Sequence, residues 1–143
     1  METHHWIIYL LYFAGAAQIF VALIYNWVRR ILEWDEAIDS MPTTLNRQIA
    51  HTYSRYIQGL NFAFGVITIA LADSFLEEPR FGAAIALLLL VYWGVRFVIS
   101  LAYYDIRAIV AQRPLYRIGN IGFSALFAMV AAIYGATASA ILF

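Results

Sequence analysis

The chain has 143 residues, of which 64% are apolar, 17% are aromatic and only 13% are charged, with a mean hydropathy of +0.74. Soluble domains are roughly half apolar and about a quarter charged, so a soluble core of this length could not hold so much hydrocarbon. Nine arginines balance nine acidic residues, so the net charge of zero gives no reason to expect a nucleic-acid partner. The absence of cysteine excludes disulfides, iron–sulfur clusters and thiolate zinc sites.

Four segments are long and apolar enough to cross a bilayer, which takes about 20 residues of helix. Helices are expected because lipid offers no partner to open backbone groups. The first and fourth spans are uncharged, whereas the second contains Asp73 and the third contains Arg96. The sequence therefore predicts a single all-α domain, a polytopic membrane protein with four transmembrane helices in an up-down bundle. The predicted spans are about 6–28, 56–76, 81–104 and 118–143.

The first connection, 29–55, has two parts. The segment before the first span, "METHH", contains no Lys or Arg, and "RR" follows the span. We therefore do not expect a cleaved signal peptide. "RRILEWDEAIDSM" alternates apolar and charged residues, which is typical either of an amphipathic helix on the inner membrane surface or of a cytoplasmic extension of the first helix. "PTTLNRQIAHTYSR" then begins the second helix, with Pro42 or a Thr near its N-terminus.

The other two connections are shorter. "SFLEEPRFG" predicts a tight hairpin, with Pro79 in the first turn of the third helix. "DIRAIVAQRPLYRIG" is expected to continue the third helix to about Gln112, and Pro114 then restarts the fourth.

The distribution of arginines predicts the orientation. Arg80 lies on one side of the predicted membrane, and seven of the nine arginines lie in the connections on the other side. By the positive-inside rule those connections are cytoplasmic, so both termini face out. The seven are Arg29, Arg30, Arg47, Arg55, Arg107, Arg113 and Arg117.

Polar and small residues recur along each span in steps of three and four, which places them on one helical face. The amides and hydroxyls concentrate in the cytoplasmic half and the outer half is mostly small, which predicts a polar pocket open to the cytoplasm. The alternative is helix packing alone, since such groups bridge membrane helices for about 0.6–2 kcal/mol each. The candidate pocket residues are Arg96, Asn26, Gln58, Asn61, Ser100, Asn120 and Ser124, with His51, Arg55 and Asp105 at its inner mouth.

Arg96 is the most costly residue in the spans, about 2.5–3.5 kcal/mol on insertion scales. It lies about 6 Å past the midpoint of its helix, and Asp73 lies about 15 Å away in depth. Asp105 is also too far along the same helix to pair with it. Three interpretations remain: Arg96 snorkels to the inner interface, donates hydrogen bonds to the amides and hydroxyls around it, or binds an anion.

Metal and cofactor chemistry is not expected. An outer cluster of Glu2, His4, His5, Asp73, Glu77 and Glu78 offers N and O ligands, but adjacent histidines near a terminus are weak grounds for a site. Haem would need two inward histidines at matched depth, which the spans lack. No nucleophile–base pair or nucleotide loop is present, so we predict no catalytic residues, no metal and no cofactor.

The stretches "LNRQIAHTYSRYIQG" and "YWGVRF" followed by "YYDIR" resemble a group of small four-span bacterial inner-membrane proteins of unassigned function. The similarity covers about a third of the chain. It implies a multi-pass protein of the bacterial cytoplasmic membrane and no particular activity.

Two functions are predicted. The first is a non-enzymatic accessory subunit or assembly factor whose apolar faces contact other membrane protein subunits or further copies of the chain. The alternative is a small oligomeric protein that transports or binds an anion or solute in a cytoplasm-facing pocket centred on Arg96.

Overall fold

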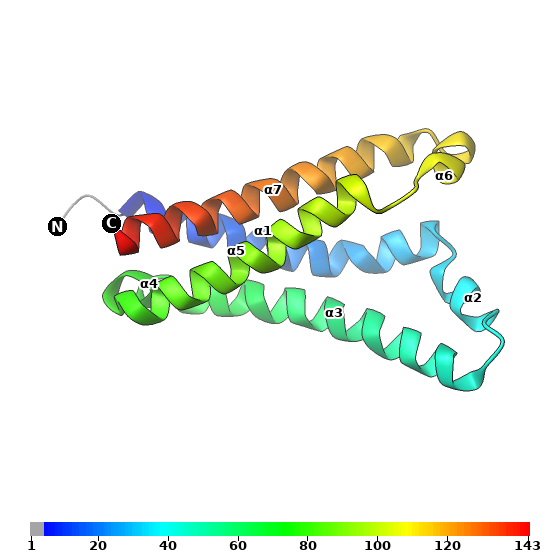
Figure 1. Ribbon diagram of the computed structural model, residues 1–143, viewed down its shortest axis with the longest axis horizontal. Helices are drawn as coiled ribbons and strands as arrows, with labels where there is room; N and C mark the ends of the chain where they lie inside the picture. Colours follow the sequence, from blue (N-terminus) through cyan, green and yellow to red (C-terminus); the bar gives the residue numbers. More distant parts are fainter. Residues whose placement is uncertain (1–4) are drawn as a thin grey trace. The chain divides into compact units, whose positions relative to one another are not determined.

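The computed structural model describes residues 5–143, which form seven helices and no strand (Figure 1). The predicted all-helical class is therefore confirmed. The four long helices have 27, 27, 24 and 28 residues, enough to exceed a hydrocarbon core of about 30 Å. The helices are α1 (His5–Ile31), α2 (Trp34–Asp39), α3 (Thr44–Ala70), α4 (Ser74–Glu77), α5 (Pro79–Ala102), α6 (Arg107–Gln112) and α7 (Leu115–Leu142).

Three of the described helices are long and apolar enough to cross a membrane: Trp6–Ile31, Pro79–Ala102 and Leu115–Leu142. These correspond to the first, third and fourth predicted spans. Although α3 is as long as α1, it does not reach the same average apolarity. The second span therefore remains a prediction.

Several predicted helix boundaries agree with the structure. Pro79 occupies the first turn of α5, where its missing N–H costs no hydrogen bond. α7 begins directly after Pro114, and α3 begins at Thr44, next to the predicted start. In the first connection, α1 extends to Ile31 and α2 follows as a separate short helix, and the location of this connection on the membrane surface or in the cytoplasm stays a prediction.

Two other boundaries differ from the prediction. The second apolar segment was expected to run to residue 76, but α3 ends at Ala70, so Asp73 directly precedes α4 instead of lying inside a long helix. The third helix was expected to continue to Gln112, and this was wrong. α5 ends at Ala102, and non-helical residues separate it from α6. Within that break the Asp105 carboxylate accepts a hydrogen bond from the Arg107 backbone N–H at 3.1 Å, a local bond that competes with helix continuation.

The described chain divides into two compact units. Unit 1 comprises residues 5–11 and 71–143, and its principal contact joins α5 to α7, which lie side by side in Figure 1. Unit 2 comprises Tyr12–Ala70, with the rest of α1 and all of α2 and α3.

Close backbone packing occurs within each unit at glycines. A Cβ on Gly82 would lie 1.9 Å from the carbonyl oxygen of Phe75, so only glycine allows α5 to fold back against α4 in unit 1. In unit 2, Gly15 of α1 and Gly65 of α3 meet in the same way. Small residues therefore set the closest helix approaches, as expected for helices packed in a membrane.

Candidate functional site

Arg96 lies within an aromatic cluster in unit 1. Its guanidinium carbon is 5.9 Å from the ring centre of Tyr92, 5.5 Å from that of Trp93 and 5.2 Å from that of Phe127. Arg96 Nη1 also donates to the Tyr92 hydroxyl at 3.2 Å. Because the face of an aromatic ring is electronegative, these rings are favourable partners for the guanidinium.

The architecture of α5 and α7 explains this arrangement. Tyr92 is one helical turn before Arg96 on α5, and Trp93 is fully buried on the same helix. Phe127 comes from α7 and lies 5.4 Å from Trp93, ring centre to ring centre. Arg96 therefore combines a hydrogen bond to a hydroxyl with contacts to rings, and snorkelling to the interface stays a prediction.

Ser100 and Ser124 form a buried hydrogen bond between the same two helices. Ser124 Oγ donates to Ser100 Oγ at 2.9 Å, and Ser100 Oγ donates to the carbonyl oxygen of Phe97 at 2.7 Å. Asn120 lies one turn before Ser124 on α7 and is half-buried. The hydroxyls predicted to line a pocket are thus used for helix pairing in unit 1.

The predicted amides of unit 2 meet around Arg55. Arg55 Nη1 donates to Asn26 Oδ1 at 3.2 Å and to Gln58 Oε1 at 3.5 Å. Gln58 Nε2 in turn donates to the carbonyl oxygen of Ala22 at 2.8 Å, which ties α3 to α1. Asn61 is buried on α3.

The candidate pocket residues therefore fall into two groups with their own contacts. Unit 1 holds Arg96, Ser100, Asn120 and Ser124, and unit 2 holds Asn26, Gln58 and Asn61. A single pocket that unites them remains a prediction.

A buried cation in unit 2 has no counterpart in the predicted site. Arg29 is only 3% exposed, donates to Ser54 Oγ at 2.6 Å and forms an ion pair with Asp35. Its guanidinium also lies 6.0 Å from the ring centre of Tyr25. Among the described residues, Arg29 Nε is a buried polar atom without a hydrogen-bond partner. This arginine joins the end of α1, the short helix α2 and the first half of α3.

The electrostatics of this cluster act on Asp35. The hydrogen bond from Arg29 holds the pKa of the Asp35 carboxyl below its usual value, against an opposing desolvation effect. Coulombic attraction from Arg29, from Arg55 and from His51 in its protonated form lowers the same pKa further. Asp35 is therefore a carboxylate at neutral pH.

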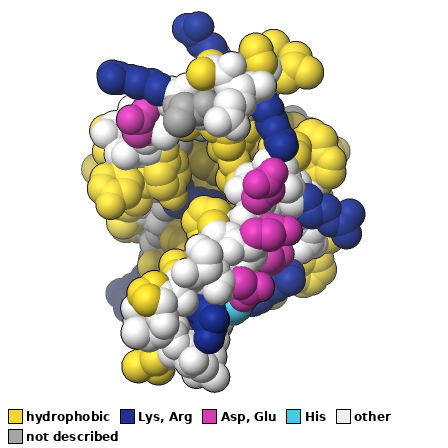
Figure 2. Space-filling view, turned by 90° about the vertical axis from the view of Figure 1, so that its right-hand side faces the viewer, with side chains coloured by type: hydrophobic (Ala, Val, Ile, Leu, Met, Phe, Trp, Pro, Cys, Tyr) yellow, Lys and Arg dark blue, Asp and Glu magenta, His cyan; other side chains and the backbone are white. Residues whose placement is uncertain are grey.

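His51 connects α3 to the same short helix. Its Nε2 lies 3.1 Å from Asp39 Oδ1, and its Nδ1 lies 3.8 Å from Asp35 Oδ1. Arg47 adds hydrogen bonds to the Asp39 carbonyl oxygen and to Thr44 Oγ1. Figure 2 shows acidic side chains gathered among arginine side chains on the face of the molecule that carries α2. Alternating charges thus fasten α2 to the helices on either side of it.

The sequence offers little warning of the Arg29–Asp35 pair, because a turn between α1 and α2 creates it. Glu33 adopts a left-handed backbone conformation, with φ at 50°, between α1 and α2. Glutamate rarely does so, and no glycine or asparagine marks the turn. The sequence feature that indicates the pair is a basic and an acidic residue six positions apart, on either side of the short turn between α1 and α2.

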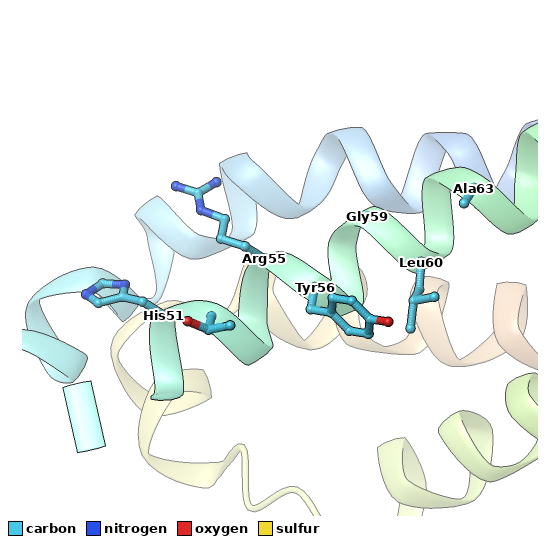
Figure 3. Close-up of a pocket in the computed structure, with 7 residues that line it drawn as sticks. His51, Arg55, Tyr56, Gly59, Leu60 and Ala63 are labelled. Atoms are coloured by element: carbon cyan, nitrogen blue, oxygen red, sulfur yellow. The ribbon is translucent and has the colours of Figure 1, made fainter. Parts of the chain in front are cut away.

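The inner-mouth candidates also divide. His51 and Arg55 lie on one face of α3 and line a hollow of about 690 Å³ with Thr52, Tyr56, Gly59, Leu60 and Ala63 (Figure 3). Asp105 belongs to unit 1, where it is exposed and contacts Arg107.

The outer acidic cluster is only partly described. Glu2, His4 and the side chain of His5 lie outside the part of the chain that the structure describes. Among the described residues, no three His, Asp or Glu side chains lie close enough together to hold a metal ion.

The geometry defines a class of protein: an all-helical chain with three helices able to cross a membrane and with cations held by aromatic rings, amides and carboxylates of their own unit. Comparison with protein-family models, with curated proteins and with solved structures finds no match.

Proposed function

We propose that this protein is a non-enzymatic accessory subunit or assembly factor of a membrane complex, which it contacts through an apolar stripe on α5. The stripe consists of Leu88, Val91, Val95 and Val98, each between 52% and 62% exposed. Their spacing of three, four and three residues is the heptad spacing of helices that pack side by side.

The composition of the stripe suits a partner helix. Three of its four members are β-branched valines, whose side chains lose little freedom when they are packed. Association of helices in a membrane depends on close van der Waals packing, because lipid is as apolar as the side chains. A regular, rigid aliphatic stripe provides such packing at little entropic cost.

The same proposal includes a fourth span formed by α3. Some of the polar residues of α3 are used inside unit 2, where Gln58 bonds to Ala22 and where Asn61 and Thr68 are buried. Its large exposed residues beyond Tyr56 are Ile57, Phe62, Val66 and Ile67, all suited to lipid. A mean hydropathy taken over a segment of the helix gives its buried and its exposed faces equal weight.

Orientation and location belong to the proposal as well. The arginines of the predicted inner connections support cytoplasmic ends for α1 and α7 at Arg29 and Arg117, with both termini outside. The resemblance to small four-span proteins supports a bacterial cytoplasmic membrane. An anion path centred on Arg96, the alternative drawn from the sequence, gains no support from contacts that occupy Arg96 with aromatic rings.

A purification experiment tests the accessory role. The chain is extracted from its native membrane in a gentle detergent after brief cross-linking, and the stoichiometry of the captured complex is measured by mass spectrometry. We expect a defined complex that is lost in Val95→Trp, because a large ring in the stripe prevents close packing. Recovery of the monomer alone would overturn the proposal.

Ile121→Trp is the matched control, because Ile121 is 60% exposed on α7 and lies outside the stripe. Both substitutions place tryptophan on an exposed surface of an apolar helix, so both proteins should insert and fold. Equal loss of the complex in the two variants would mean that the α5 stripe is not the contact surface.

A further inference from the structure

The hollow on α3 changes from polar to apolar along its length. Its first part carries His51, Thr52 and Arg55, and its last part carries Gly59, Leu60 and Ala63. Arg55 is the last charged residue of α3, since residues 56–70 contain none. From Arg55 to Ala63 the helix rises about 12 Å, close to the depth of one leaflet of hydrocarbon.

A second hollow, of about 290 Å³ between α1 and α3, meets the first at two residues that line both, Arg55 and Gly59. Arg55 is the cationic group at this junction. Gly59 has no side chain and lies where the polar part of the lining ends. Beyond it the lining is apolar, with Leu60 and Ala63 in the first hollow and Phe62 in the second.

The charge of Arg55 is not neutralised by an ion pair. Its hydrogen bonds go to the neutral amide oxygens of Asn26 and Gln58, and within residues 5–143 no carboxylate makes an ion pair with it. The nearby acidic residues already have cationic partners, Arg29 for Asp35 and His51 for Asp39. Figure 3 shows the Arg55 side chain extended away from the α3 axis.

Gly59 has no packing reason to be glycine. A Cβ placed there would meet no atom within 4 Å, whereas at Gly15 or Gly65 it would collide with backbone. Gly94, Gly119 and Gly122 are equally open, so what distinguishes Gly59 is its position beside Arg55 in the lining of both hollows. Here the absent side chain leaves room for a ligand beside the guanidinium.

We propose that this hollow binds one anionic phospholipid, with its phosphate at Arg55 and an acyl chain along Gly59, Leu60 and Ala63. Guanidinium matches phosphate by paired hydrogen bonds, and the apolar end matches hydrocarbon. The inference rests on the location of α3 in a bilayer and does not depend on the accessory role.

Lipid retention by the purified full chain tests the site. The protein is titrated with phosphatidylglycerol or phosphatidylcholine of identical chains in neutral detergent, and bound lipid is counted by native mass spectrometry. We expect phosphatidylglycerol to be retained at a concentration about fivefold lower than phosphatidylcholine, because one basic group favours an anionic lipid by a factor of this size. Arg55→Gln should remove that preference, and Arg55→Lys should keep part of it.

Gly59→Leu should weaken retention of both lipids, because the new side chain fills the apolar end without touching the protein. Arg117→Gln and Gly119→Leu are matched controls, since Arg117 and Gly119 line neither hollow and a Cβ on Gly119 also meets nothing. Circular dichroism and thermal unfolding establish that each variant is folded.

Equal retention of the two lipids, or unchanged preference in Arg55→Gln, would overturn the proposal. Inorganic phosphate is added as a competitor in a separate arm. Displacement of phosphatidylglycerol by millimolar phosphate would show that the site binds a free anion and would overturn the assignment to a lipid.

Discussion

Gly15 of α1 and Gly65 of α3 pack against each other reciprocally. A Cβ on Gly15 would lie 2.8 Å from the Gly65 carbonyl oxygen, and a Cβ on Gly65 would lie 2.7 Å from the Gly15 carbonyl oxygen. The absence of a side chain at each glycine therefore leaves room for the backbone of the other helix. This contact fixes the distance between the two long helices of unit 2 and so aligns Gln58 with Ala22 and Arg55 with Asn26.

Substitution at this crossing should be costly. Gly65→Ala forces the backbone of α1 away from α3, and we expect a loss of about 1–3 kcal/mol in the free energy of unfolding, as for other overpacked contacts. The measurement is reversible unfolding in mixed micelles of increasing sodium dodecyl sulfate. Gly59→Ala on the same helix is the control and should stabilise by about 0.5–1 kcal/mol. Equal effects at both positions would contradict a special role for the Gly15–Gly65 contact.

Arg96 and Phe127 should be energetically coupled. A double-mutant cycle of Arg96→Gln and Phe127→Leu removes the closest of the three ring contacts, and we expect a coupling of about 0.5–2 kcal/mol in the free energy of unfolding. Phe81→Leu serves as the control, because Phe81 lies about four turns away on α5 and should combine additively with Arg96→Gln. Additivity at Phe127 would mean that the ring contributes packing alone.

The attachment of α2 should weaken at acid pH, because it depends on the ionised carboxylate of Asp35. Its pKa in the folded protein is held below the ordinary 3.8, so its contribution to stability is present above that pH and is lost as the pH falls through the lowered pKa. At pH 7, Asp35→Asn should increase amide hydrogen exchange in α2, because Arg29 then loses its ionic partner. Glu36→Gln is the control on the same helix and should leave the exchange unchanged. Similar exchange in both variants would show that the Arg29 pair does not hold α2.

The Ser100–Ser124 hydrogen bond should contribute measurably to the pairing of α5 and α7. We expect a coupling of about 0.5–1.5 kcal/mol between Ser100→Ala and Ser124→Ala in the free energy of unfolding. Ser100→Ala with Ser139→Ala should be additive, since Ser139 is exposed near the far end of α7. A pocket role for these hydroxyls would instead predict little coupling and a change in ligand retention.

Local features of the chain predicted much of the fold. Apolar runs predicted the long helices because spanning helices need about 20 such residues. Pro79, Pro114 and the threonines before α3 predicted helix starts because each restricts the backbone or caps it locally. The steps of three and four that include Gly15 and Gly65 predicted close helix faces, since helical periodicity depends on sequence spacing alone.

The partners of the charged groups were decided by the tertiary structure. Arg96 lies against Phe127 of another helix, and Arg29 pairs with Asp35 only because Glu33 turns the chain in a left-handed conformation. Spacing along one helix says which residues share a face, but it does not say which side chain of another helix meets them. The sequence by itself determined that Arg96 required stabilisation within an apolar helix, and only the folded α5–α7 pair determined that aromatic rings provide it.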